Sequence, residues 1–201
     1  MNPPLREKTP QRRKNRKVCK HFKSYKKTLR EDFLQRCGYC SSFDRIRNRS
    51  FAIDHFIPQT PDGWTHTILP NYYYNLVYSC GHCNSSKSNK WPTRDVAKPN
   101  NGISGFVDPV DAQYDELFHR DVNGFIVAQD TTNQLAEYIR NELSLYLPVH
   151  SILWKLEKID NAIDEIKTKL AKTADKDLRD IQAKLQDEYY ELTKELFKIE
   201  L

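Results

Sequence analysis

The sequence predicts an α+β protein, with a small core of two strands and one helix that is surrounded by helices and followed by an antiparallel helical hairpin. Three patterns predict this class. Apolar residues at three- and four-residue steps predict amphipathic helices, and short apolar runs bounded by turn residues predict strands. A heptad-like repeat near the C-terminus predicts two long helices. A length of 201 residues suits one compact domain with an appendage, or two small domains.

The first 30 residues are strongly basic. They contain twelve lysines and arginines and a single acidic residue, Glu7, in a chain whose net charge is +5. We expect residues 1–20 to form an arm that is disordered when unbound, because they offer little apolar surface to bury. A basic arm on an acidic body is typical of nucleic-acid binding, since phosphate contacts release counterions. A merely solubilising terminus is the alternative.

The next segment, residues 21–93, is predicted to hold the core. Apolar positions from His21 to Arg36 define one face of a helix: Phe22, Tyr25, Leu29 and Phe33. The runs 51–53 and 76–78 are predicted as two strands with a long, turn-rich connection. A short helix is expected from Asn84 to Lys90, where Pro92 stops it.

Two further segments follow. Residues 94–148 are predicted as an accessory α/β extension, with a strand after Asn123-Gly124 and a helix that ends near Pro148. Residues 149–201 are predicted as the helical hairpin, because leucines and isoleucines repeat at alternating steps of three and four on both sides of a break at 171–176. Packing on the chain's own core and docking on a partner, or on a second copy, are both open for this hairpin.

Four of the five cysteines form two C-x2-C pairs, Cys37 with Cys40 and Cys80 with Cys83. Each pair bends the backbone so that two thiolates face one ion, and four thiolates complete a closed tetrahedral zinc site. Such a site is structural, because it leaves no position for water. Cys19 is expected to be a free thiol.

The sequence also bears on location. No window approaches 18 uncharged apolar residues, so no transmembrane helix is expected. No apolar stretch follows the basic N-terminus, so we expect no secretory signal and a reducing, cytoplasmic location.

Polar residues between and beside the two C-x2-C pairs, the zinc knuckles, follow one another in a recognisable order. Asp54-His55 ends the first predicted strand, Asn75-Leu76 opens the second, and Cys83-Asn84-x-x-Lys87 leads into the short helix. At these positions the sequence resembles the HNH, or ββα-metal, nuclease family, in the branch that carries a four-cysteine zinc site. The nine-residue step from Asn75 to Asn84 also matches that family.

The resemblance implies a role for each of these residues. His55 matches the general base that takes a proton from water. Asp54 and Asn84 match the ligands of one catalytic metal, and their hard oxygen donors favour Mg²⁺ or Mn²⁺. Asn75 matches the residue that bridges the loop and orients the histidine, and Lys87 is predicted as a phosphate contact. Taken singly, the two asparagines would fit turn or cap positions equally well.

The predicted function is therefore a metal-dependent HNH endonuclease that hydrolyses DNA with little sequence specificity, because small HNH domains mainly contact the backbone. The alternative is a non-catalytic zinc-knuckle subunit that binds nucleic acid and docks on a larger complex through its C-terminal helices. The run Tyr72-Tyr73-Tyr74 fits stacking on unpaired bases, but we expect at least one of these rings in the core.

A second resemblance lies beyond the HNH motif. The segments Gly105-Phe-Val-Asp-Pro109 and Tyr114-Asp-Glu-Leu-Phe118, followed by Asn123-Gly-Phe-Ile and a leucine-rich helix, look like HNH proteins that accompany an ATPase in prokaryotic anti-phage systems. It implies a role in antiviral defence and an ATPase partner. The chain itself has no P-loop, so a partner would have to supply any nucleotide chemistry.

Overall fold

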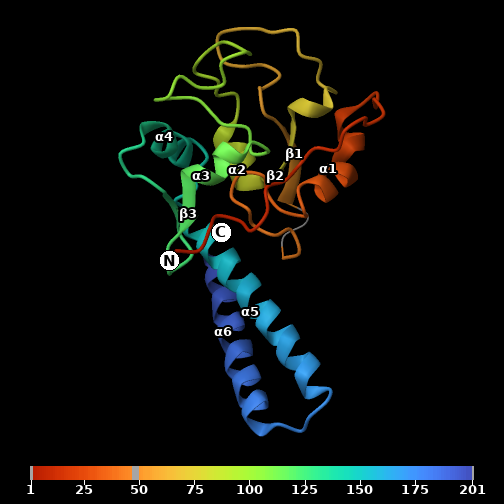
Figure 1. Cartoon of the computed structure of the whole chain (residues 1–201), viewed down its shortest axis with the longest axis vertical. Coiled ribbons are helices and arrows are strands. Elements are labelled where there is room, and N and C mark those ends of the chain that lie inside the picture. The colour runs from red at the N-terminus through yellow and green to blue at the C-terminus, as the bar shows by residue number, and fades with distance from the viewer. Residues whose placement is uncertain (1, 47–49, 201) are drawn as a thin grey trace. The chain divides into compact units, whose positions relative to one another are not determined.

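A computed structural model describes residues 2–46 and 50–200 and divides the chain into two compact units, residues 1–146 and 147–201. The mixture of helices with small antiparallel sheets confirms the α+β class (Figure 1). The first unit contains, in order, α1 (Lys26–Asp32), β1 (Phe51–His55), β2 (Leu76–Cys80), α2 (Gly81–Lys87), α3 (Ala112–Leu117), β3 (Phe118–Arg120), β4 (Ile126–Ala128) and α4 (Gln134–Glu142). Short 3-10 helices, Phe22–Tyr25 and Tyr73–Asn75, precede α1 and β2.

The centre of the first unit is an antiparallel hairpin of β1 and β2, followed at once by α2. Phe51 pairs with Cys80 and His55 pairs with Leu76, so the polar end of β1 lies beside the start of β2. Both strands lie where the apolar runs predict them. Helix α2 begins three residues earlier than expected, because Cys80 is extended and the helix starts directly after it. It ends at Lys87, and the next residue, Ser88, has a φ of +48°.

The predicted helix from His21 to Arg36 is shorter in the structure. A 3-10 turn at Phe22–Tyr25 leads into α1, and the helix ends before Leu34 and Gln35, which both adopt positive φ angles. Its apolar face is nevertheless as predicted, since Tyr25, Leu29 and Phe33 are buried and Phe22 is partly buried.

The N-terminal arm differs from the disordered segment that the sequence predicts, because residues 2–20 lie along the first unit. Leu5 is buried in the core, and Pro4 forms a β-bridge with His119. Three arginines find carboxylates on the body: Arg6 bonds Asp115 at 2.5 Å, Arg12 bonds Asp108 at 2.8 Å and Arg13 bonds Asp32 at 2.6 Å. These ion pairs and the buried leucine hold the arm in place.

Residues 94–146 share one core with the hairpin. Phe106, Tyr114 and Leu135 belong to the same buried cluster as Tyr39 and Val77. Arg120 on β3 is also buried, and its guanidinium donates to the carbonyls of Gly124 and Cys40. The predicted extension therefore buttresses the first cysteine knuckle.

The second unit is the predicted helical hairpin, formed by α5 (Pro148–Leu170) and α6 (Lys176–Glu200) (Figure 1). The heptad positions Leu156, Ile159, Ile163 and Ile166 of α5 are buried, as is Leu196 of α6. Within the described ranges no helix is both long and apolar enough to cross a membrane.

Candidate active site and zinc site

The four paired cysteines converge on one point. Their Sγ atoms all lie within 4.8 Å of one another, and those of Cys40 and Cys80 are 3.7 Å apart. Four sulfurs at the usual zinc–sulfur distance of about 2.3 Å would form a tetrahedron with edges of about 3.8 Å. All four side chains are buried, and Cys19 lies outside the cluster. The cluster therefore fits a closed, structural zinc site.

The first knuckle depends on close packing around Gly38. A Cβ atom there would lie 2.8 Å from both the Phe33 ring and a Val77 methyl group. The backbone N–H of Gly38 also donates to the carbonyl of Tyr78 at 2.8 Å. A glycine at this position lets the knuckle approach β2 closely enough for its thiolates to meet those of Cys80 and Cys83.

His55 lies at the end of β1 and is held by the loop that precedes β2. Its Nε2 is 2.8 Å from the carbonyl oxygen of Pro70. The side-chain nitrogen of Gln59 lies 3.0 Å from the same Nε2. We assign the hydrogen to Nε2 from the shorter contact, because the Pro70 carbonyl can only accept, and Nδ1 then carries the lone pair of the neutral ring. The Phe22 ring packs edge-on against the imidazole, with centroids 4.8 Å apart. Burial lowers the pKa of His55, and the Pro70 hydrogen bond partly opposes this.

Asp54 and Lys87 form a buried ion pair behind His55. The Lys87 Nζ lies 3.2 Å from Asp54 Oδ2 and donates to the backbone carbonyl of His55 at 2.8 Å. The Tyr39 hydroxyl donates to Asp54 at 2.5 Å. Burial lowers the pKa of Lys87, although Asp54 opposes the shift.

The position of Lys87 differs from the exposed phosphate contact that the sequence predicts. Its side chain has no exposed surface, because α2 packs the last helical turn against β1. Its ammonium group forms an ion pair with Asp54 and a hydrogen bond with the His55 carbonyl. Lys87 therefore links α2 to the strand that carries His55.

Asn75 closes the turn that follows His55. Its Oδ1 accepts from the backbone N–H of Ile57 at 2.8 Å, and its Nδ2 donates to the Ile57 carbonyl at 2.9 Å. The backbone carbonyl of Asn75 also accepts from Phe56 at 2.8 Å. The structure thus places Asn75 as a bridge across the loop, two residues beyond the histidine.

Asn84 lies on α2, one turn before Lys87 and therefore on the side of the helix that faces the end of β1. Carboxylate and amide oxygens suit a hard divalent cation. A carboxylate offers about four lone-pair positions, so Asp54 keeps acceptor capacity beyond its contacts with Tyr39 and Lys87. In donor chemistry, Asp54 and Asn84 fit such an ion.

Several contributing groups could not be recognised from the sequence. Tyr39 lies inside the first knuckle, where nothing in the pattern indicates a bond to Asp54. The Pro70 carbonyl is a backbone group and carries no side-chain signal. Asp44, buried beneath β2, accepts from the Tyr78 hydroxyl and from Arg30.

A ββα unit closed by four cysteines, with a histidine at the end of its first strand, is the arrangement that the HNH resemblance predicts. The family model described as HNH endonuclease matches residues 37–90, which include both knuckles, β1, β2 and α2. Residues 37–90 are therefore an HNH endonuclease domain. Neither a curated protein nor a solved structure matches the chain.

Proposed function

We propose that the protein is a metal-dependent endonuclease that hydrolyses DNA phosphodiester bonds, with His55 as its general base. The observation that carries this proposal is the bond from His55 Nε2 to the Pro70 carbonyl within an HNH domain. That bond fixes the ring and leaves Nδ1 as the proton acceptor.

In this mechanism each residue of the chain has a separate task. His55 Nδ1 removes a proton from the attacking water. Asn75 holds the turn after His55, and the Asp54–Lys87 pair fixes the strand from which the histidine projects. Asp54 and Asn84 would hold the divalent ion, with Mg²⁺ or Mn²⁺ favoured by their oxygen donors. When bound, that ion neutralises negative charge at the scissile phosphate and the leaving oxygen.

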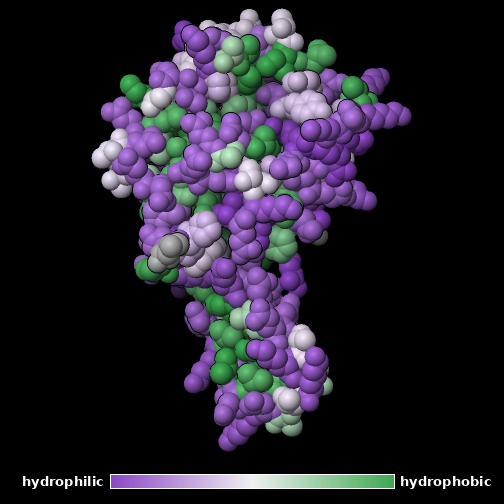
Figure 2. All heavy atoms as spheres, viewed as in Figure 1, coloured by the Kyte–Doolittle hydropathy of each residue, from purple (hydrophilic) through white to green (hydrophobic). Residues whose placement is uncertain are grey.

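Binding of DNA is supported by the basic residues near the N-terminus, because some are paired with carboxylates and others are exposed and, in the part of the chain that the structure describes, unpaired. Arg6, Arg12 and Arg13 pair with carboxylates of the body. Six lysines of the same region are exposed, and the described residues offer them no ion-pair partner: Lys14, Lys17, Lys20, Lys23, Lys26 and Lys27. In Figure 2, hydrophilic side chains gather over α1 and its neighbourhood. Contacts from lysine to phosphate give affinity with little sequence choice.

Finer aspects of the function remain predictions. One site per chain predicts nicking, and a double-strand break then needs a second copy or a second event. The role in antiviral defence, the ATPase partner and self-association through the C-terminal helices follow from the sequence resemblance and the heptad pattern alone.

The test is cleavage of supercoiled plasmid by the purified full chain, with Mg²⁺, with Mn²⁺ and with a chelator. We expect cutting that requires the added metal and that disappears in His55→Ala. The matched control is His119→Ala, which removes a histidine on β3, outside the site.

Cutting that persists in His55→Ala would contradict the assignment of the base. If neither protein cuts but both bind zinc and retard DNA, the non-catalytic binding subunit becomes the better description.

A further inference from the structure

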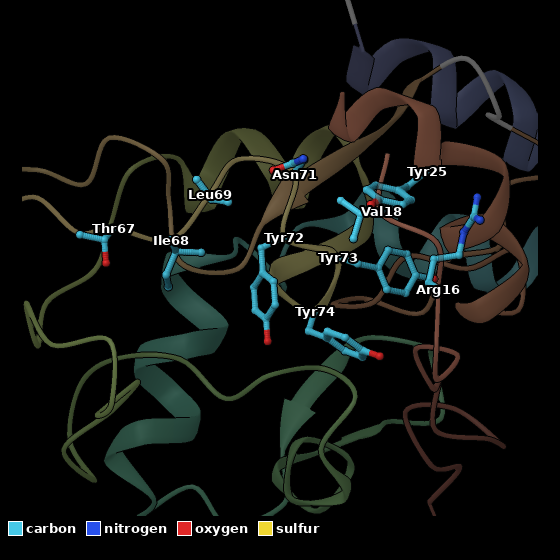
Figure 3. A pocket seen from close by; sticks show the side chains of 10 residues that line it. All are labelled: Arg16, Val18, Tyr25, Thr67, Ile68, Leu69, Asn71, Tyr72, Tyr73 and Tyr74. Atoms are coloured by element: carbon cyan, nitrogen blue, oxygen red, sulfur yellow. The ribbon is translucent and has the colours of Figure 1, made fainter. Parts of the chain in front are cut away.

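A pocket with a volume of about 420 Å³ opens beside the nuclease site (Figure 3). Its walls come from the end of the arm, the 3-10 turn before α1, and the loop before β2. The lining is mostly apolar and aromatic: Arg16, Val18, Tyr25, Thr67, Ile68, Leu69, Asn71, Tyr72, Tyr73 and Tyr74.

The three consecutive tyrosines have different surroundings. Tyr73 is buried, and its hydroxyl donates to Asp32, so this ring belongs to the core as the sequence predicts for at least one of them. Tyr72 and Tyr74 remain 52% and 43% exposed, with ring centroids 5.7 Å apart. Figure 3 shows both rings at the pocket, where they offer aromatic surface to a ligand.

The pocket is joined to His55 through the loop before β2. Leu69 and Asn71 line it, and Pro70 between them accepts the hydrogen bond from His55. Asn71 also donates to the carbonyl of Cys19 at 2.8 Å, which joins this loop to the lysine-rich segment. A ligand in the pocket would therefore contact the same loop that holds His55, and this loop is also tied to the lysine-rich segment.

The charge of the pocket favours an anionic ligand. The guanidinium of Arg16 lies over the Tyr25 ring at 5.5 Å, and its buried Nε has no hydrogen-bond partner among the described residues. Exposed Lys14, Lys17 and Lys20 adjoin it in the chain. Exposed rings beside unpaired cations match a nucleotide, whose base stacks and whose phosphates are negative.

We propose that this pocket binds one unpaired nucleobase beside the scissile phosphate, so that the preferred substrate is a nucleic-acid strand that is locally single-stranded. The proposal rests on the proposed nuclease function and adds a substrate class to it. A base inside a duplex is stacked and paired, and cannot enter the pocket without being extruded. Single-stranded DNA and an RNA loop present the same chemistry.

The experiment compares cleavage of four substrates of one sequence by the full chain. They are a paired DNA duplex, the duplex with a short single-stranded gap, the gapped duplex with an abasic site in the gap, and the gapped form with RNA as the unpaired strand. We expect kcat/KM to be roughly 5- to 150-fold higher for the gapped DNA than for the duplex, as base stacking on aromatic side chains implies. The abasic substrate should lose this preference, and the RNA arm identifies the source of the base.

Variants then assign the preference to the pocket. The double variant Tyr72→Ala/Tyr74→Ala should abolish it, whereas Tyr72→Phe/Tyr74→Phe should retain it, because stacking needs the ring and not the hydroxyl. The matched control is Tyr190→Ala, which removes an exposed tyrosine from α6. Quenching of 2-aminopurine placed in the gap reports stacking independently of cleavage.

Equal cleavage of paired and gapped DNA, or quenching that survives in the alanine double variant, would overturn the pocket proposal and leave the nuclease standing. If no substrate is cut but quenching is lost in the alanine variant, the pocket stands and the proposed nuclease function fails.

Discussion

Lys87 lies three residues after Asn84, a spacing that the sequence reads as two side chains on one helix face turned towards a phosphate. The spacing is correct, since both residues lie on α2. However, the Lys87 side chain is buried, because its ammonium group reaches back to Asp54 and the carbonyl of His55. A sequence pattern fixes which residues share a face, but the depth of that face depends on how closely the helix packs against β1.

Replacement of Lys87 by methionine should lower the free energy of unfolding by about 3–5 kcal/mol, because it leaves the buried Asp54 carboxylate without its cation. Urea unfolding measures the change. The control is Lys90→Met, which removes a partly exposed partner of Glu142 and should cost no more than about 1 kcal/mol. A change at Lys87 as small as that control would show that its charge is not buried.

The pH dependence of cleavage should carry the signature of a partly buried base. His55 must be neutral to accept a proton, and burial lowers its pKa, so the ring stays neutral at lower pH than an exposed histidine. The acidic limb of kcat/KM should therefore lie below pH 6.5, the ordinary value for histidine. Rates measured from about pH 5 to pH 8 test this.

Phe22→Ala uncovers the His55 imidazole and should move the acidic limb of the kcat/KM profile to higher pH. A wild-type limb above neutrality would contradict His55 as the titrating group.

At the scale of elements, the β1–β2 hairpin and α2 were predictable because their signals are local. The strands follow from short apolar runs, and the knuckles from cysteine spacing. The arm was not predictable, because its order depends on residues distant in sequence: Arg6 pairs with Asp115 and Arg12 with Asp108. The composition of the arm predicts only how it would behave by itself. Its conformation in the protein depends on carboxylates that lie far away in the sequence.

Loss of one zinc ligand should prevent the first unit from folding. Structural zinc supplies about 10–16 kcal/mol in small zinc modules, which is comparable to the whole stability of an ordinary domain. We expect Cys83→Ser to lose both bound zinc and a cooperative thermal transition, as measured by metal analysis and near-UV circular dichroism.

Cys19→Ser, which changes the cysteine outside the cluster, should retain both properties. A Cys83→Ser protein with native zinc content and native melting temperature would exclude the four-cysteine site.

At the scale of the whole molecule, the excess positive charge is concentrated in exposed lysines before and within α1, while Arg6, Arg12 and Arg13 are neutralised by carboxylates. The sequence shows where the basic residues are, but only the fold separates those that stabilise it from those that are available to phosphate. The net charge of +5 therefore understates the local positive field around α1.

The triple variant Lys17→Gln/Lys20→Gln/Lys23→Gln should weaken nucleic-acid binding and reduce the slope of log K against log salt by about 2 to 3, since each phosphate contact contributes about 0.7 to 0.9. Binding titrations at several salt concentrations measure this slope. The matched control, Lys172→Gln/Lys176→Gln/Lys184→Gln, removes three exposed lysines of the second unit. An equal loss of binding affinity in both triple variants would show that binding depends on the net charge of the chain and not on the position of these lysines.

The attachment of the arm also has an entropic consequence. A flexible tail would lose about 1–2 kcal/mol of backbone entropy for each residue that it orders on a ligand. Here Arg6, Arg12 and Arg13 already hold the chain against the body, and folding has met that cost before any nucleic acid arrives. The arm therefore adds charge to the surface without adding an ordering penalty to binding.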